Sequence, residues 1–214
     1  MKKFLTAVTA LLMTASLAGC GAKDSAADET TPEPEATQET ASEETDTKEE
    51  TVPETADEKT LVVYFSCTGN TKDVAEKIAE ITYADLYEIR PAQEYTSEDL
   101  NWHDSSTRAT SEQNDPDARP EIGSEPLKLE GYTTVYIGYP IWWGEEPRIM
   151  DTFVESYDFS DLTVIPFCTS GGSGIGRSGS NMESLAGAGT WLEGQRFSGN
   201  VSEEELQSWI EGLK

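Results

Sequence analysis

The sequence has few positively charged residues, and this shortage limits the ligands it can bind. Lysine and arginine together number 15, against 41 aspartates and glutamates, so the formal net charge at pH 7 is −26. A protein that binds nucleic acid needs a basic surface to neutralise phosphates. We therefore expect no nucleic-acid partner.

Histidine and cysteine are also scarce. His103 is the only histidine, and the cysteines are Cys20, Cys67 and Cys168. No cysteine pair has the short spacing typical of zinc ligands, so we expect no metal site. His103 stands in a polar segment and is interpreted as a loop residue. No group has the pattern of a catalytic acid, base or nucleophile, and we predict no catalytic residue.

The amino-terminal residues have the pattern of an export signal. Two lysines after Met1 precede an apolar stretch over residues 4–17 that is too short to span a bilayer comfortably. Leu17-Ala18-Gly19-Cys20 resembles the bacterial lipobox. This resemblance implies a lipoprotein signal peptide over residues 1–19 and lipid chains on Cys20, which would hold the exported protein at the cell membrane. The alternative is a plain signal peptide with an incidental cysteine.

Residues 21–58 form an acidic tether in this interpretation. Between residues 24 and 58 there are 14 acidic residues and one lysine, and Val52 is almost the only large apolar residue. Such a segment cannot bury enough apolar surface to offset the entropy lost on ordering. We expect residues 20–58 to be a lipid-anchored cysteine and a disordered tether, and residues 59–214 to be the folded domain. A binding role for the acidic run is a less favoured alternative.

The domain begins with a strand, a polar turn and a helix. Residues 61–65, Leu-Val-Val-Tyr-Phe, are typical of a strand buried on both faces. The hydroxyl-rich turn 66–71 then leads into a helical pattern. Unpaired amides at a helix start attract anions, and Gly69 lets the backbone approach closely. The turn lacks Lys, Arg and the Gly-x-Gly-x-x-Gly dinucleotide pattern, so it would hold a phosphate by amides and hydroxyls. The alternative is an ordinary polar turn that caps the helix.

The rest of the domain repeats strands and helices. We predict strands over residues 86–90, 132–139, 162–168 and, weakly, 195–198, and helices over residues 147–154, 180–185 and 202–213. In the last helix, Ser202 and Glu205 fit a capping box. This alternation predicts an α/β fold, a doubly wound five-stranded parallel sheet with helices on both faces and right-handed crossovers.

Residues 92–126 interrupt the alternation. This excursion has no convincing helical or strand period, and structureless connections of this length are uncommon unless they are functional or disordered. It contains Tyr95, Trp102 and two arginines, so we expect an ordered loop packed on the domain. Two interpretations stay open, a cover over a bound ligand and a surface excursion that closes one side of the sheet.

Three strand-to-helix loops carry a resemblance to a known family. Ser66-Cys67-Thr68-Gly69-Asn70-Thr71 after Val-Val-Tyr-Phe is similar to the FMN-phosphate loop of flavodoxins. Tyr-Pro-Ile-Trp-Trp-Gly at 139–144 and Phe-Cys-Thr-Ser-Gly-Gly-Ser at 167–173 resemble loops of one flavodoxin-like subfamily, as does the excursion. The resemblance covers residues 59–214. It implies strand order 2-1-3-4-5 and FMN at the carboxyl ends of the strands.

Carried over by position, the resemblance assigns three sets of cofactor-binding residues. The phosphate loop comprises Ser66, Cys67, Thr68, Gly69, Asn70 and Thr71. The ribityl chain and ring would lie beside Pro140, Ile141, Trp142, Trp143 and Gly144. The edge of the ring would lie along Thr169, Ser170, Gly171, Gly172 and Ser173. Because adjacent side chains in a loop often diverge, we expect one tryptophan to stack on the ring, without choosing between them.

The implied strand order also bears on the cysteines. Cys67 and Cys168 end the first and fourth strands, which are two places apart, roughly 9–10 Å at the usual spacing. A disulfide requires Cα atoms within about 7 Å. We therefore predict two free and largely buried thiols.

The resemblance favours an FMN-binding, flavodoxin-like protein that carries electrons between redox partners at the outer face of the cytoplasmic membrane. Its partners would be redox proteins or a small electron acceptor. One alternative is an FMN-dependent NAD(P)H:quinone-type oxidoreductase, for which Arg108, Arg119, Arg148 and Arg177 could bind a phosphate. Another is a surface binding protein that has lost the flavin. The acidic domain predicts a depressed potential for the second reduction step.

Overall fold

The structure, a computed structural model, describes residues 59–213. The predicted signal peptide, the lipidation site at Cys20 and the acidic tether lie outside the described residues. No helix between residues 59 and 213 is both long enough and apolar enough to cross a membrane.

A parallel sheet forms the centre of the domain. Its main strands are β1 (Thr60–Tyr64), β2 (Asp85–Glu88), β3 (Thr134–Pro140) and β4 (Thr163–Thr169), followed by β5 (Thr190–Trp191). They lie in the order β2-β1-β3-β4-β5, and every pair is parallel. The predicted fold class and strand order are confirmed.

The fifth position of the sheet is divided between two short strands. β5 pairs with Thr163 and Val164 at the start of β4, and β6 (Gln195–Phe197) pairs with Phe167 to Thr169 at its end. Proline in a strand favours a bulge or an edge, and Pro166 stands between these two pairings. A Cβ on Gly194 would lie 2.8 Å from the Pro166 carbonyl oxygen, so the chain passes closely there. The prediction of one strand over 195–198 missed β5.

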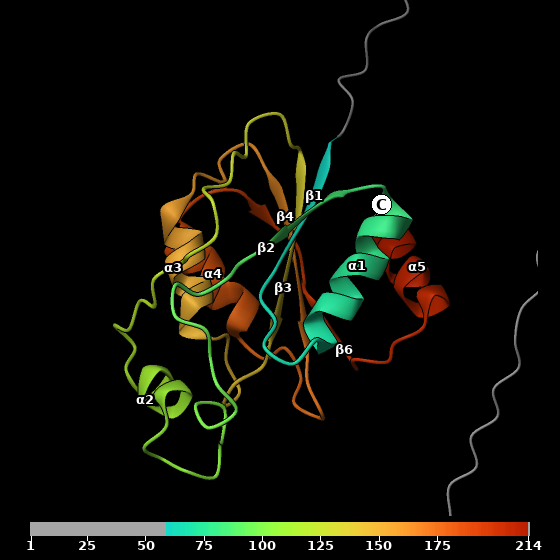
Figure 1. Ribbon diagram of the computed structural model, residues 1–214. Helices are drawn as coiled ribbons and strands as arrows, with labels where there is room; N and C mark the ends of the chain where they lie inside the picture. Colours follow the sequence, from blue (N-terminus) through green and yellow to red (C-terminus); the bar gives the residue numbers. More distant parts are fainter. Residues whose placement is uncertain (1–58, 214) are drawn as a thin grey trace, which may run out of the picture. The chain divides into compact units, whose positions relative to one another are not determined.

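Helices cover both faces of the sheet. α1 (Asn70–Thr82) and α5 (Glu203–Gly212) lie on one side, and α3 (Arg148–Ser156) and α4 (Ser178–Ala186) lie on the other (Figure 1). The side chains of β1 alternate between the two layers: Leu61 and Val63 belong to the α3 and α4 core, and Val62 and Tyr64 to the α1 and α5 core. The Ser202 side chain accepts a bond from the Glu205 amide at the start of α5, as expected for a helix cap.

The excursion contains a helix that the sequence did not predict. α2 (Arg108–Asn114) begins after Thr107, whose side chain accepts a bond from the Thr110 amide. Its buried residues are Ala109, Thr110 and Gln113, so its buried face is largely polar and gives no apolar period. α2 lies beyond the carboxyl ends of the strands, near the end of the sheet where α1 begins (Figure 1).

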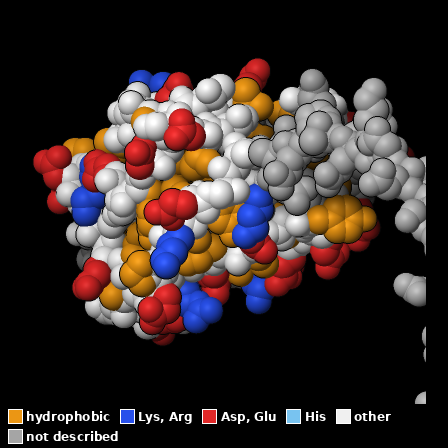
Figure 2. All heavy atoms as spheres, turned by 90° about the horizontal axis from the view of Figure 1, so that it is seen from above, with side chains coloured by type: hydrophobic (Ala, Val, Ile, Leu, Met, Phe, Trp, Pro, Cys, Tyr) orange, Lys and Arg blue, Asp and Glu red, His pale blue; other side chains and the backbone are white. Residues whose placement is uncertain are grey.

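The opposite end of the sheet presents the amino ends of the strands. There, residues 127–132, 156–158 and 160–162 line a groove of about 370 Å³. Figure 2 looks onto this end and shows apolar side chains in its middle, with charged side chains of both signs among them. This end is separate from the loops to which the sequence assigns the cofactor.

Candidate functional site

The turn after β1 places donors around the start of α1. Gly69, at φ 90°, is the N-cap residue and contributes no capping side chain, so the first amides of a 13-residue helix are not bonded by the cap. The Gly69 backbone amide donates to the Ser66 hydroxyl at 3.1 Å, and the Asn70 side-chain amide donates to the Thr68 hydroxyl at 3.2 Å. Amides and hydroxyls around a helix N-terminus are suited to a phosphate.

The turn after β3 displays two indoles. The Trp142 amide donates to the Glu145 carbonyl at 2.9 Å, and the Glu145 amide donates back at 3.0 Å. The two residues between them, Trp143 and Gly144, have φ values of 49° and 89°. Positive φ at both central positions defines a type I′ turn, which normally takes asparagine and glycine. Left-handed backbone costs a residue like tryptophan about 1–2 kcal/mol.

The two tryptophans diverge, as expected for neighbours in a loop. Trp142 packs edge-on against Phe65 and Tyr95, with ring centroids 5.6 and 5.2 Å away, and so joins the core. Trp143 is 47% exposed and is absent from the core clusters. Trp142 is thus a wall fixed by its neighbours, whereas Trp143 projects from the turn.

The turn after β4 connects to the first turn. Thr169 is buried, and its hydroxyl lies 2.8 Å from that of Thr71. Arg196 of β6 donates to the Ser170 hydroxyl at 3.1 Å and also to the Ser170 carbonyl. Gly171, Gly172 and Ser173 are exposed. A buried pair of hydroxyls thus holds this turn beside the turn after β1.

A cavity of about 350 Å³ opens at this edge of the sheet. Of the predicted site residues, its lining includes Ser66, Cys67, Thr68, Thr71, Pro140, Ile141, Trp142 and Trp143. The predicted site residues that do not line it are Gly69, Asn70, Gly144, Thr169, Ser170, Gly171, Gly172 and Ser173. The first two turns therefore meet around the cavity, and the third stands beside it.

Residues of the excursion complete the lining, and the sequence did not assign them to the site. They are Leu100, Trp102 and Ala109. Trp102 is 68% exposed, and its ring lies 3.5 Å from that of His103 between centroids. A tryptophan in a polar segment was the signal that could have identified this wall. The cavity favours the interpretation of the excursion as a cover.

Arg108 and Tyr95 hold the first half of the excursion. The Tyr95 hydroxyl donates to the Glu112 carboxylate at 2.5 Å, and Arg108 donates to the same carboxylate at 2.6 Å. The Arg108 guanidinium also lies over the Tyr95 ring, 4.0 Å from its centroid. Burial and the bond to Glu112 both raise the pKa of Tyr95. Tyr95 stays a neutral donor and supports Trp142.

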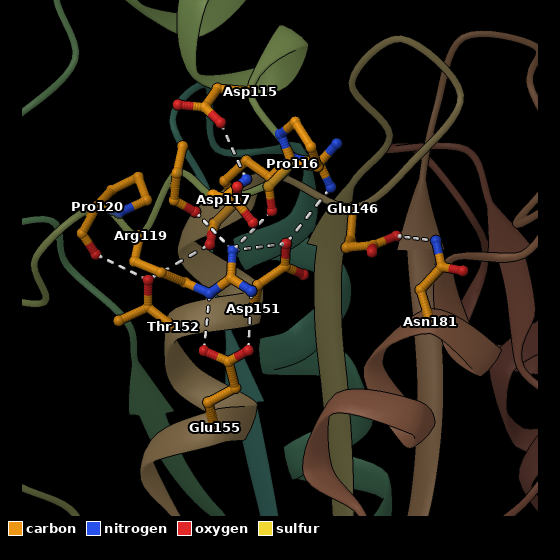
Figure 3. A network of polar contacts seen from close by, with 12 residues as sticks. Asp115, Pro116, Asp117, Arg119, Pro120, Glu146, Asp151, Thr152, Glu155 and Asn181 are labelled. Carbon is orange, nitrogen blue, oxygen red and sulfur yellow. Dashed lines mark hydrogen bonds and ion pairs between the residues drawn. The ribbon is translucent and has the colours of Figure 1, made fainter.

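Arg119 holds the second half of the excursion against α3. It donates two bonds to the Glu155 carboxylate, at 2.7 and 2.8 Å, and the Thr152 hydroxyl donates to the Pro120 carbonyl at 3.0 Å. Figure 3 shows Arg119 between Glu155 and Asp151. Asp151 is 2% exposed, and burial raises its pKa despite the nearby guanidinium groups of Arg148 and Arg119.

Glu146 is a buried carboxyl group at the end of the second turn. It is 1% exposed and accepts a bond from the Asn181 side-chain amide at 3.3 Å (Figure 3). Burial raises its pKa to about 7. The charges of Asp151 and Glu145 act in the same direction, whereas hydrogen bonds from its own backbone amide and from Asn181 oppose the rise. The group is therefore partly protonated at neutral pH.

Cys67 and Cys168 are free thiols. Cys168 is buried, but Cys67 is only partly so, because it lines the cavity. Burial raises the pKa of each thiol to about 12. Since the thiolate is the nucleophile, Cys67 contributes an uncharged surface to the cavity.

A polar turn at a helix start, an aromatic turn and a covering excursion meet at the carboxyl edge of a parallel sheet. This arrangement defines an α/β protein built to hold a ligand with an anionic group and a planar ring. The family model described as Flavodoxin matches residues 59–213. The chain belongs to the flavodoxin family.

Several solved structures are similar to this chain. A candidate flavoprotein from Bacteroides uniformis is 43% identical, covers 72% of this chain and 97% of its own, and gives a TM-score of 0.69. A candidate flavoprotein from Bacteroides eggerthii is 42% identical with the same coverage and a TM-score of 0.68. A flavoprotein from Lactobacillus acidophilus in complex with FMN is 25% identical, covers 72% of this chain and 99% of its own, and gives a TM-score of 0.55. No curated protein matches the chain.

Proposed function

We propose that this chain is an FMN-binding flavodoxin-like protein that carries electrons between redox partners at the outer face of the cytoplasmic membrane. The cavity carries the proposal, because it joins the polar turn at the start of α1 to the aromatic turn after β3. Its cofactor is FMN, as family membership and the FMN complex of the Lactobacillus acidophilus relative support.

The residues of the cavity fit the parts of FMN. The uncapped amides of α1 and the hydroxyls of Ser66, Thr68 and Thr71 would hold the phosphate. Trp142 and Trp143 both line the cavity, and one of the two indoles would stack on the planar ring. When bound, FMN supplies one- and two-electron transfer, the chemistry that no side chain here provides.

The chain's own residues would position the cofactor. The buried pair of Thr71 and Thr169 fixes the phosphate loop to the end of β4. Phe65 and Tyr95 fix the ring of Trp142 by edge contacts. The neutral Cys67 thiol adds no charge to the cavity.

The membrane location is part of the proposal and depends on residues 1–58. Lipid chains on Cys20 would anchor the protein, each buried CH₂ contributing about 0.8 kcal/mol. The Cys20→Ser variant should still be exported, but it should no longer be found in the membrane fraction. Mass spectrometry of the mature amino terminus gives an independent measurement, and an unmodified Cys20 would contradict the anchor.

A second candidate is an FMN-dependent oxidoreductase that reduces a small planar acceptor. The observation that favours it is the exposure of Trp102 and Trp143 on the same cavity, where they could stack on such an acceptor. Direct use of NAD(P)H is less well supported, because three of the four arginines considered are paired with carboxylates: Arg108 with Glu112, Arg119 with Glu155, and Arg148 with Glu145 and Asp151.

The absorbance spectrum of the purified protein tests the proposal. A flavin spectrum is expected, with FMN as the compound released on denaturation and one FMN bound per chain on reconstitution. A colourless protein that does not retain added FMN would contradict the proposal and favour a binding protein that has lost the flavin. Steady oxidation of NAD(P)H without a separate reductase would favour the oxidoreductase.

A further inference from the structure

The excursion lines the cavity on a side where the turn after β4 was expected to lie. Residues 170–173 do not line the cavity, whereas Leu100, Trp102 and Ala109 do. All three excursion residues contribute apolar surface, and Trp102 contributes a flat indole. This wall suits a planar ring and has nothing to offer a phosphate.

One helix connects this wall to the rest of the site. Ala109 and Gln113 are four residues apart in α2, on the same buried face. The Gln113 side-chain amide donates to the Glu146 carbonyl at 3.0 Å, and Gln113 is 7% exposed. The residue that meets the cavity and the residue that meets the aromatic turn are thus neighbours on a single helix.

Arg148 of α3 strengthens the same attachment. It donates to the Gln113 carbonyl at 3.1 Å and to the Glu145 carboxylate at 3.0 Å. Its other amino group lies 3.4 Å from the Asp151 carboxylate. The end of α2, the end of the aromatic turn and the start of α3 are therefore held together by Gln113 and Arg148.

The attachment of α2 is separate from that of the second half of the excursion. Arg119 and Pro120 bind α3 further along, through Glu155 and Thr152 (Figure 3). Loss of the Gln113 contact would leave those bonds in place. Its effect should therefore fall on residues 100–109, which face the cavity.

We propose that Gln113 is a positioning residue that holds α2 against the aromatic turn, so that Leu100, Trp102 and Ala109 form a wall for the planar ring of the cofactor. The inference rests on the proposed function, since it concerns the same FMN site. It assigns ring recognition partly to the excursion and leaves phosphate recognition to the turn before α1.

Comparing FMN with riboflavin separates these two contributions, because riboflavin has the same ring without the phosphate. The apoprotein is titrated with each ligand, and the dissociation constants are read from flavin fluorescence. Gln113→Ala should raise both constants by the same factor, between about two and ten, as expected for one lost hydrogen bond, because the bond from Arg148 goes to the Gln113 backbone carbonyl and is kept. Thr68→Val, in the phosphate loop, should raise the constant for FMN and leave that for riboflavin unchanged.

Matched controls remove the same groups elsewhere. Gln207→Ala is the control for Gln113→Ala. It deletes an exposed glutamine of α5 that donates to Glu211, and it should leave both constants unchanged.

Trp102→Ala tests the wall itself. It changes an exposed side chain and should not impair folding, but it should weaken the binding of both ligands by about threefold to tenfold. Its control is Tyr83→Ala, which removes a 96% exposed aromatic side chain at the far end of α1 and should weaken the binding of neither ligand.

Hydrogen exchange gives a readout that is independent of binding strength. With FMN bound, Gln113→Ala should increase amide exchange over residues 100–109 but not over residues 119–126. If circular dichroism shows that Gln113→Ala does not fold, the Trp102→Ala titration tests whether the wall formed by the excursion contributes to binding of the ring.

The outcomes separate this inference from the proposed function. If the wild-type apoprotein binds neither ligand, the proposed function fails and the inference fails with it. If the wild type binds both ligands but Trp102→Ala and Gln113→Ala bind as the controls do, the inference alone is overturned. A loss confined to FMN would also overturn it, because the effect would then lie in the phosphate loop.

Discussion

At the scale of single residues, Glu146 links protonation to stability. Its pKa is about 7 in the folded protein and 4.5 is the ordinary value. The folded state therefore retains a proton between pH 4.5 and 7 that the unfolded state has released. The contribution of Glu146 to the free energy of unfolding is fully present below pH 4.5. It decreases as the pH rises from 4.5 to 7 and stays at the lower value above pH 7. A pKa raised from 4.5 to about 7 lowers the free energy of unfolding at high pH by on the order of 3 kcal/mol.

Glu146→Gln should remove this pH dependence. Glutamine keeps an acceptor for Asn181 without the buried charge, so the variant should unfold at higher urea concentration than the wild type at pH 8 and at a similar one at pH 4.5. Asp151, whose pKa is also raised, leaves a residual dependence in the same direction. Glu183→Gln, at an exposed position of α4, is the control. A variant whose stability falls with pH as steeply as the wild type would contradict the assignment.

At Trp143, the free-energy cost of the left-handed backbone can be measured separately from the contribution of the indole to FMN binding. Asparagine adopts the left-handed conformation of a type I′ turn readily, whereas a β-branched residue does not. Trp143→Asn should therefore be more stable to urea than Trp143→Val by about 1–2 kcal/mol. Both variants lack the indole, so both should bind FMN more weakly than the wild type and by similar factors. Equal stabilities would argue against the turn geometry.

At the scale of secondary-structure elements, the packing of β4 against β3 depends on a glycine that lies under the Phe167 ring. Gly138 pairs with Phe167, and a Cβ on Gly138 would lie 2.1 Å from an atom of the Phe167 ring. Both strands are buried and end at the site. The glycine thus makes room for an aromatic ring that fills the α1 and α5 core.

Gly138→Ala should destabilise the domain by about 1–3 kcal/mol, because the Phe167 ring must leave its place in a packed core. Urea unfolding measures the change. Gly212→Ala makes the same substitution in α5, where a Cβ meets nothing within 4 Å. That control should be neutral or up to about 1 kcal/mol stabilising. A Gly138→Ala variant as stable as the wild type would show that β4 can shift.

The elements that sequence could predict are those whose pattern is local. β1, β3 and β4 are buried on both faces and are therefore apolar runs, and α5 has a serine cap and an apolar face. The split of the last strand depends on a close approach between Gly194 and Pro166, which no local pattern reports. α2 was missed because its buried face is held by Gln113 and other polar contacts.

The candidate site divides in the same way. The turns after β1 and β3 were predictable because each follows a strand directly, and parallel topology brings their ends to one edge. The contribution of Leu100, Trp102 and Ala109 depends on how a long connection folds back over that edge. Its anchors are single polar side chains, Gln113 and Arg119, far apart in sequence from their partners.

At the scale of the whole molecule, charge should govern the reduction potential. Residues 59–214 include 27 acidic and 11 basic residues, a net charge of −16. Adding an electron to a bound flavin increases negative charge inside a negative field, so the second reduction step should lie at a lower potential than in free FMN. Salt screens exposed charges beyond about 8–10 Å. The potential should therefore rise with ionic strength, and a value at or above that of free FMN in low salt would contradict the prediction.

A matched pair of aspartates separates local from global charge. Asp104, two residues from Trp102, accepts bonds from the amide and hydroxyl of Ser106, and these bonds lower its pKa, so it is ionised at pH 7. Asp158, at the opposite end of the sheet, has the same arrangement with Ser160 and also a lowered pKa. In low salt, Asp104→Asn should raise the potential of the second step by on the order of 10 mV, the Coulomb effect of one nearby charge in water. Asp158→Asn should change it less because of its greater distance. Equal shifts from the two variants would mean that net charge alone, and not the charge around the cavity, sets the potential.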